Sequence, residues 1–392
     1  MTSPSTLTTV VHCNLPDSIE TGRTLGDDIL KAFGGRAPQA VILFVSPRYD
    51  VKALAAALTE RCTPEALVGC SSAGEFTHEI QNQGYACAIA ICSNEMSFTA
   101  GIGHRLSEDR ERAADEVLKS VTARQLVPSA YSSALVLTDA LAGHADELIE
   151  ALTLRTGGNY QFFGGGAGDD ANFKSTQVIC GTEVSSDAVV VLEILSSKPI
   201  GIGVRHGWTR ASDLMRVTES AGPLLASLNG IPAVEVFREH AARTSQKFDE
   251  KDPLPFFLHN ILGIQTSGGY KLRVPLAVGS DGTVGCAAEV PVGSIVCIMA
   301  TDAESAQEAA VHATRDALEQ LQGHKPKVAL FFDCVATRLR LGKNFGIELD
   351  GLRQTLGSVP FAGCNTYGQI ARVDGQFSGF HNCTAVVCVF PE

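Results

Sequence analysis

The chain has 392 residues, of which 45% are hydrophobic and 19% charged, so it is long enough for two or three globular domains. The formal net charge of -12, without a basic cluster, argues against binding to nucleic acid or to an anionic membrane surface. The longest apolar runs, such as Ala40–Val45, are far shorter than a membrane span, and residues 1–16 lack the pattern of a secretory signal. We therefore predict a cytoplasmic protein without a membrane span.

Twelve cysteines raise the question of disulfides or a metal site, and their positions argue against both. The sequence has no C-x-x-C pair, as a zinc ribbon or a thioredoxin-like site would require. Most of the cysteines stand inside apolar, β-like runs, where cysteine behaves as a small hydrophobic residue. We therefore predict reduced cysteines in a cytoplasmic compartment.

Hydrophobic periodicity predicts strands and helices that alternate along most of the chain, as in an α/β fold. The predicted helices span residues 24–33, 51–61, 107–126, 145–154, 223–229, 233–243, 302–321 and 345–356. The predicted strands span residues 39–45, 66–70, 85–92, 96–101, 134–138, 160–163, 176–180, 188–195, 200–210, 215–219, 264–265, 271–278, 283–286, 294–301, 327–333, 359–363 and 377–390.

One order of elements occurs twice, which predicts two, or with a further copy three, related α/β halves with mixed sheets and repeated strand–helix–strand–glycine-turn units. The first copy runs from strand 96–101 to a glycine turn at 164–168, and the second from strand 294–301 to a glycine turn at 363–368. We predict an N-terminal lead over residues 1–22, one domain over 23–220, and a second over 221–392 with a charged, linker-like stretch at 245–255.

Three stretches share one outline: Val68–Phe76, Phe162–Asp170 and Phe361–Ile370. Each has an apolar lead-in, a glycine, small residues, a second glycine and then an acid or an amide. This order is typical of a buried strand that enters a tight turn, where glycine permits the close approach of a backbone or a ligand. We predict that the three turns converge on one small-molecule site, because clefts near strand ends bind ligands in α/β proteins. The alternative is that they are tight turns with a packing role only.

The sequence gives less support to a phosphate loop or a catalytic nucleophile in these turns than to a small-molecule binding site. Gly164–Asp170 lacks the Lys-Ser/Thr pair of a phosphate loop, and its two acids would repel a phosphate. Gly69–Gly74 misses the G-x-S-x-G nucleophile elbow by one residue, although Cys70 or Ser71 near a base would still be a nucleophile. Asp169 and Asp170 would hold an amine or a cation, or else cap a turn.

Two histidines stand in apolar surroundings. His206 precedes Gly207-Trp208 in a β-rich run, and His259 follows Phe256-Phe257-Leu258. A neutral histidine in an apolar pocket can be an axial ligand of haem. We predict His206 and His259 as candidate axial ligands of haem b, and the alternative for each is a hydrogen-bonded structural histidine.

Five ordered motifs resemble those of one known family. They are Val68–Phe76, Phe162–Asp170, Gly207–Thr209, Leu228–Phe237 and Tyr367–Ile370. Together they resemble FIST proteins, which carry a FIST N domain followed by a FIST C domain, and the resemblance covers nearly the whole chain. Gln369 stands where the family commonly carries glutamate, so this sequence lacks one charge there.

The resemblance implies a bacterial sensory or signal-transduction module that binds small ligands, amino acids among them. One branch of the family binds haem, senses nitric oxide and regulates a partner histidine kinase in a two-component system. No kinase pattern is present in this sequence, so any output would pass through a partner, and a homodimer is a further option.

We therefore predict a small-ligand sensor that regulates a histidine kinase and is not itself an enzyme, with haem-based nitric oxide sensing as its first version. The alternatives are a haem-free sensor of an amino-acid-like metabolite and a cysteine-dependent enzyme. The predicted ligand contacts come from the three glycine turns. They are Cys70, Ser71, Ser72, Gly74, Glu75, Gly165, Gly166, Gly168, Asp169, Asp170, Cys364, Asn365, Tyr367 and Gln369.

Overall fold

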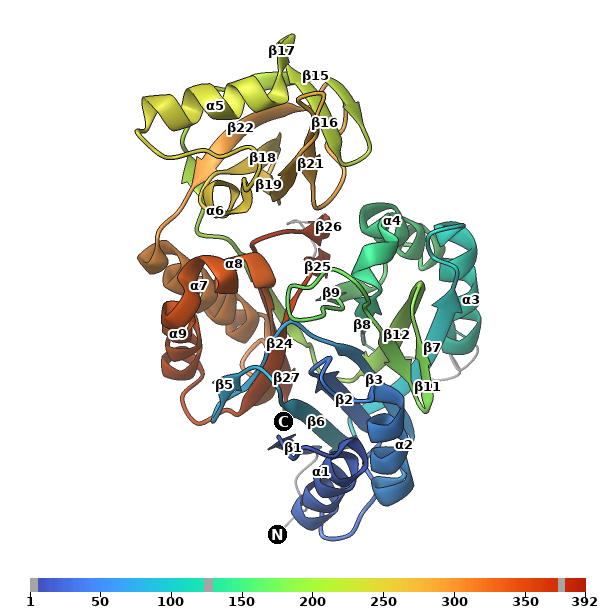
Figure 1. Ribbon diagram of the computed structural model, residues 1–392. Helices are drawn as coiled ribbons and strands as arrows, with labels where there is room; N and C mark the ends of the chain where they lie inside the picture. The colour runs from blue at the N-terminus through green and yellow to red at the C-terminus, as the bar shows by residue number, and fades with distance from the viewer. Residues whose placement is uncertain (1–5, 123–129, 373–377) are drawn as a thin grey trace.

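Three units with the same order of elements form most of the chain in the computed structural model, which describes residues 6–122, 130–372 and 378–392 (Figure 1). In each unit the last strand lies between the first and second strands and pairs antiparallel with both. The second strand runs parallel to the third, which leads into a glycine turn. The three strand orders are β1-β6-β2-β3, β7-β12-β8-β9 and β13-β27-β23-β24.

The units follow one another along the chain. The first consists of β1 (Thr6–Cys13), α1 (Ser18–Ala32), β2 (Ala40–Val45), α2 (Val51–Cys62), β3 (Ala66–Ser71) and β6 (Ala86–Ser93). The second consists of β7 (Met96–His104), α3 (Arg110–Thr122), β8 (Tyr131–Thr138), η1 (Ala140–Ala142), α4 (Ala145–Arg155), β9 (Gln161–Gly166) and β12 (Ala188–Ser196). The third consists of β13 (Gly201–Arg205), α7 (Ala303–Gln320), β23 (Pro326–Cys334), α8 (Val335–Leu341), η2 (Gly342–Phe345), α9 (Gly346–Leu356), β24 (Phe361–Thr366) and β27 (Ala385–Pro391).

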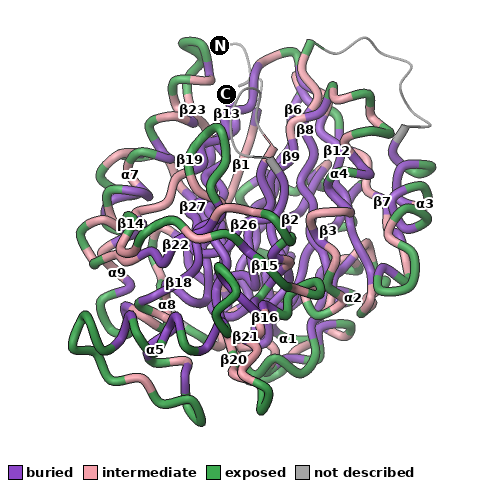
Figure 2. The backbone as a smooth tube through the Cα atoms, turned by 90° about the horizontal axis from the view of Figure 1, so that it is seen from above, coloured by how far each residue is buried: buried purple, intermediate pink, exposed green. Residues whose placement is uncertain are grey.

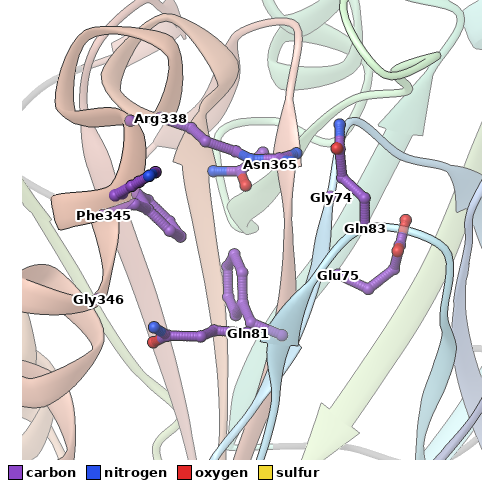
Figure 3. Close-up of a pocket in the computed structure, with 11 residues that line it drawn as sticks. Gly74, Glu75, Gln81, Gln83, Arg338, Phe345, Gly346 and Asn365 are labelled. Carbon is purple, nitrogen blue, oxygen red and sulfur yellow. The ribbon is translucent and has the colours of Figure 1, made fainter.

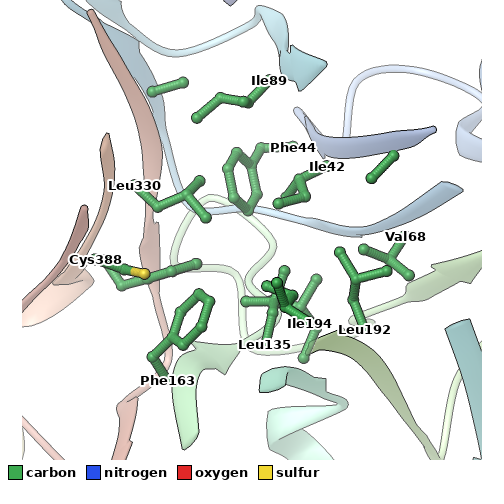
Figure 4. Packing of buried hydrophobic residues seen from close by; sticks show 14 of the residues in the cluster. Ile42, Phe44, Val68, Ile89, Leu135, Phe163, Leu192, Ile194, Leu330 and Cys388 are labelled. Atoms are coloured by element: carbon green, nitrogen blue, oxygen red, sulfur yellow. The ribbon is translucent and has the colours of Figure 1, made fainter. Parts of the chain in front are cut away.

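Both faces of each sheet are buried, which explains why strands such as β2 consist only of apolar residues. A pair of helices covers each outer face: α1 with α2, α3 with α4, and α7 with α9 (Figure 1). The inner faces of the three sheets meet in one shared core, where Phe44, Phe163 and Leu330 come from different sheets (Figure 4). The buried backbone is accordingly concentrated in the central strands (Figure 2).

A hairpin that follows each glycine turn pairs with the sheet of another unit. The hairpin after the first turn joins the third unit's sheet beside β24, and the hairpin after the third turn joins the second unit's sheet beside β9. The hairpin after the second turn joins the first unit's sheet beside β3, so the exchange is cyclic and draws the three turns together. The hairpins are β4 (Glu75–Thr77) with β5 (Gln81–Asn82), β10 (Val178–Cys180) with β11 (Glu183–Ser185), and β25 (Gln369–Arg372) with β26 (Ser378–His381).

A further module is inserted between β13 and α7 of the third unit and lies at the top of Figure 1. Lys271 and Arg273 of this module each form an ion pair of 2.5 Å with Asp146 of α4, which ties the module to the second unit. The module consists of β14 (Thr209–Arg210), β15 (Met215–Ala221), β16 (Leu224–Leu228), β17 (Ile231–Pro232), α5 (Ala233–Arg243), α6 (Leu254–Phe257), β18 (Ile261–Thr266), β19 (Gly269–Arg273), β20 (Pro275–Val278), β21 (Val284–Cys286) and β22 (Ile295–Ala300).

The predicted α/β class with mixed sheets is confirmed, and the structure contains three repeated units, the larger of the two numbers that the sequence allowed. The strand predicted over residues 294–301 is β22 of the inserted module, whereas the strand that matches β7 is β13. Because the insertion separates β13 from α7, the strand that directly precedes α7 in the sequence is β22, and it was predicted as the first strand of the unit. The predicted helix 223–229 is strand β16, which a two-residue turn at Asn229 and Gly230, both with positive φ, joins to β17.

Other predictions concern the ends of elements and the domain limits. The predicted lead, residues 1–22, includes β1 and the start of α1, and the predicted boundary at 220/221 falls at the end of β15. The end of the predicted helix 107–126 and residue Phe377 lie outside the described residues. Within the described part of the chain, no helix has the length and apolarity that a membrane span needs. The cysteines are free thiols.

Candidate functional site

The three glycine turns meet at one point. Each follows the third strand of its unit, which is β3, β9 or β24. The strand registers make Ala73, Gly168 and Tyr367 equivalent positions, and the N–H group of each donates to the carbonyl oxygen of a neighbouring turn. These hydrogen bonds run from Ala73 N to Asn365 O (2.9 Å), from Gly168 N to Ser71 O (2.9 Å) and from Tyr367 N to Gly166 O (3.0 Å).

The turns therefore converge, as expected, and backbone fills the point where they meet. A Cβ atom on Gly168 would lie 2.8 Å from the Ala73 nitrogen, and one on Gly166 would lie 2.6 Å from the Ala140 Cβ. Contacts this short require glycine at both positions. The alternative that the turns have a packing role therefore applies to the residues at the point where they meet. A ligand has room only beside this point.

A polar pocket of about 310 Å³ lies beside this centre, between the first and third turns (Figure 3). This volume is at the lower end of the range for small-molecule sites. Figure 3 shows the Arg338 side chain of α8 reaching across the pocket toward Asn365, with Glu75 and Gln83 on one side and Phe345 on the other. The lining residues are Gly74, Glu75, Phe76, Gln81, Gln83, Arg338, Gly342, Lys343, Phe345, Gly346 and Asn365.

Opposite charges face one another in this pocket. Glu75 is buried, and its carboxylate accepts hydrogen bonds from the Ser72 hydroxyl and from the backbone N–H of Tyr85. Burial raises the pKa of Glu75 to about 7, although these hydrogen bonds lower it. Burial also raises the pKa of Asp170, and the Arg338 guanidinium opposes that rise. Glu75 and Arg338 thus line the pocket together, and Asp170, which is not part of the lining, interacts electrostatically with the same guanidinium.

The raised pKa of Glu75 predicts a pH-dependent stability. The unfolded chain releases this proton near its ordinary pKa of 4.5, whereas the folded protein keeps it until about pH 7. The free energy of unfolding should therefore fall by up to about 3 kcal/mol between these values as the pH rises, and the Glu75→Gln variant should lose that part of the slope. Urea unfolding of both proteins across the window measures the difference. Identical slopes would contradict the raised pKa.

A buried acid pair positions Asn365 in the pocket wall. The Asn365 amide donates to an oxygen of Asp333 at 3.3 Å, and both residues are 1% exposed. Burial raises the pKa of both Asp333 and Glu348, and the charge of Glu348 raises the pKa of Asp333 further. The pair fixes the amide orientation of Asn365, so its side-chain oxygen faces the polar pocket near Gly74.

Several residues predicted to touch a ligand have internal partners instead. The Cys70 and Cys364 side chains belong to the central core, which does not fit the alternative of an exposed thiol nucleophile. The Ser71 hydroxyl accepts from the backbone N–H of Gln177, and the buried Gln369 amide bonds with Thr366 and Thr384.

Asp169 organises the loop after the second turn. Its carboxylate accepts hydrogen bonds from the backbone N–H groups of Phe173, Lys174 and Ser175 at 2.7–2.9 Å, and from the Tyr367 hydroxyl. Burial alone would raise the pKa of Asp169, but these donors lower it below its ordinary value. The turn-capping alternative therefore describes Asp169, and Asp170 is the acid that faces the guanidinium. Gly165 lies against Thr366 and Gly368 in the packed centre.

His206 has little room for haem in this structure. The His206 Nε2 lies 3.2 Å from the Tyr270 carbonyl oxygen, and its Nδ1 lies 3.3 Å from the Trp208 backbone nitrogen. The cavity beside His206 measures about 10 Å³, far below the space that a macrocycle needs. His259 does not line the polar pocket.

The most prominent charge in the polar pocket, Arg338, was absent from the predicted site. It lies on α8, a helix of seven residues that the periodicity did not indicate. A guanidinium has five N–H donors, and among the described residues only the Ala73 carbonyl oxygen accepts from one of them. The signal available in the sequence was a pair of arginines, Arg338 and Arg340, which follow the predicted buried strand 327–333 within a few residues.

Comparison with known families agrees with this architecture. A model of the FIST N domain matches residues 39–231, and a model of the FIST C domain matches residues 233–372. The chain belongs to the FIST family. FIST domains are sensory domains that bind small ligands, so this FIST protein is a small-ligand sensory protein. No curated protein matches the sequence.

Solved structures resemble this FIST protein only distantly. The crystal structure of a cyanuric acid hydrolase from A. caulinodans is 8% identical over 99% of both chains, with a TM-score of 0.39. Phosphoribosylformylglycinamidine synthase II from Thermotoga maritima is 10% identical over 98% of this chain and 72% of its own, with a TM-score of 0.22. Similarity at this level carries no argument about chemistry.

Proposed function

We propose that this FIST protein senses a small zwitterion of the amino-acid class, bound without haem in the polar pocket between the first and third glycine turns. The observation that supports it is one guanidinium, at Arg338, set against the carboxyl groups of Glu75 and Asp170 beside a cavity of about 310 Å³. A guanidinium recognises a carboxylate through paired hydrogen bonds, and a carboxylate recognises an ammonium group. Asn365 and Gln83 add amide groups that can orient such a ligand.

A route for the signal follows from the position of Arg338. Its guanidinium donates to the Ala73 carbonyl oxygen, and Ala73 belongs to the ring of hydrogen bonds that joins the three turns. A ligand carboxylate that draws the guanidinium into the pocket would weaken this bond and shift α8 against the turns. In the proposal a partner histidine kinase responds to that shift, as the family resemblance implies.

Thermal denaturation in the presence of each of the twenty standard L-amino acids tests the proposal. Saturating concentrations of a true ligand should raise the melting temperature by several degrees, since 100-fold excess over Kd adds about 2.7 kcal/mol. Propylamine and propionate, which carry one charge each, serve as controls and should give no shift. A panel without any shift would contradict the amino-acid class.

Haem-based sensing of nitric oxide is the rival proposal. It predicts that protein purified from haem-supplemented cells shows a Soret band that moves when nitric oxide is added. A colourless protein that responds to an amino acid would support the zwitterion proposal, and a shifting Soret band would favour the rival.

A further inference from the structure

A second pocket, apolar and about 100 Å³ in volume, lies between the inserted module and the second and third units. Leu254, Leu258 and Leu276 form its wall on the module side, and Val335 and Tyr367 belong to the wall on the other side. Helix α8 contributes to both pockets, because Arg338 lines the polar one and Val335 lines the apolar one. The lining of the apolar pocket is completed by Ala140, Leu141, Phe173, Val274, Ala287, Cys334, Ala336, Leu339, Gly368 and Asn382.

Large apolar side chains at the rim of this pocket are exposed to solvent. Leu141, Phe173 and Leu339 are 43%, 42% and 42% exposed, and they come from three separate segments. Exposed apolar side chains that gather around a cavity mark a binding site rather than ordinary surface. Their convergence therefore points to a ligand that is itself apolar.

The loop that carries Phe173 is held in a strained conformation. Asp170, Ala171 and Phe173 have φ angles of 55°, 63° and 52°, in the left-handed region that side chains disfavour. The Asp169 carboxylate holds the loop by accepting three backbone N–H groups, and the Phe173 ring stacks on Tyr367 with centroids 4.5 Å apart. Strain that the surroundings maintain in this way is found at ligand sites. Here it places an aromatic wall at the mouth of the pocket.

We propose that this apolar pocket binds a small molecule through one aromatic ring or one branched aliphatic group. The pocket has about two thirds of the volume of an apolar cavity of about 150 Å³ that takes up benzene, so part of a ring would lie between the exposed side chains at its rim. Because the walls come from the inserted module and from the second and third units, an occupant would hold the module against these two units. The proposal is independent of the zwitterion site, because it requires no charge on the ligand.

Fluorobenzene provides an uncharged probe of the right size. Fluorine NMR of fluorobenzene with wild-type protein should show line broadening and saturation transfer, with a Kd in the millimolar range or below. The Ala287→Phe variant places a ring in the pocket from an exposed position, and it should lose at least 10-fold in affinity. The Phe173→Ala variant removes the aromatic wall and should lose about 3-fold.

The Ala56→Phe variant is the matched control, since Ala56 is exposed on α2 and is not part of the lining. It should bind fluorobenzene as the wild type does. Equal binding by wild type and Ala287→Phe would overturn the proposal. Absence of probe binding, combined with self-association of the wild type that Ala287→Phe abolishes, would also overturn it and assign the patch to contact between two copies of the chain.

Discussion

Replacement of Gly363 by alanine is expected to lower the free energy of unfolding by about 3 kcal/mol or more. A Cβ atom on Gly363 would lie 1.8 Å from the Phe331 carbonyl oxygen of the parallel strand β23 and 2.7 Å from the Phe76 ring. The first of these neighbours is backbone within a buried sheet, so it can move only if the sheet separates. Urea denaturation, followed by circular dichroism, measures the loss.

Gly268→Ala provides the control for this variant. Gly268 is exposed, its φ is not in the left-handed region, and no atom lies within 4 Å of its ideal Cβ position. Its replacement should change the free energy of unfolding by no more than about 0.5 kcal/mol. If Gly363→Ala were as stable as Gly268→Ala, the close approach between β23 and β24 would be absent in solution.

The glycine turns could be predicted because their sequence reports a local physical requirement. Gly69, Gly164 and Gly363 all face a carbonyl oxygen of the adjacent parallel strand, with ideal Cβ positions 2.2, 2.0 and 1.8 Å from it. Small residues must stand wherever backbones meet this closely, so the same outline recurs in each unit. The register of β2 with β3 and of its two counterparts explains why the turns end at one point.

The third unit could be recognised from its first helix onward, but its start could not, for a topological reason. Its first strand, β13, and its first helix, α7, are separated by the inserted module, so the local order of elements was lost. Pairing of β13 with β27 depends on contacts between distant parts of the chain, which periodicity does not report. The hairpin at Asn229 and Gly230, by contrast, carried a recognisable turn signal that the helical interpretation overlooked.

In the polar pocket, too, the residues next to a glycine turn could be predicted from the local sequence, whereas those from distant segments could not. Glu75 was predicted because it follows a glycine turn, whereas Arg338 reaches it from a short helix of another unit. Cys70 was predicted from position alone, but the strand pleat turns its side chain into the core, on the opposite side from Ser71. Which face a side chain takes depends on register, and register is fixed by the whole sheet.

Replacement of Arg338 by methionine is expected to lower the affinity for the amino acid identified in the thermal panel by about 100-fold, or roughly 3 kcal/mol. Methionine keeps much of the length of the side chain but cannot donate to a carboxylate, and it leaves Glu75 and Asp170 without their opposing charge. Isothermal titration at pH 7 gives the affinity. The affinity of the Arg338→Lys variant, which keeps the charge but lacks the planar guanidinium, should fall between that of the wild type and that of Arg338→Met.

Arg315→Met is the matched control for that measurement, because Arg315 is exposed on α7 and is not part of the polar pocket's lining. It should bind the same amino acid as the wild type does. Since Arg338 also donates to the Ala73 carbonyl oxygen, the melting temperature of each variant without ligand separates lost binding from lost folding. A folded Arg338→Met protein that keeps wild-type affinity would remove the guanidinium from the site, and with it the reason to expect a carboxylate on the ligand.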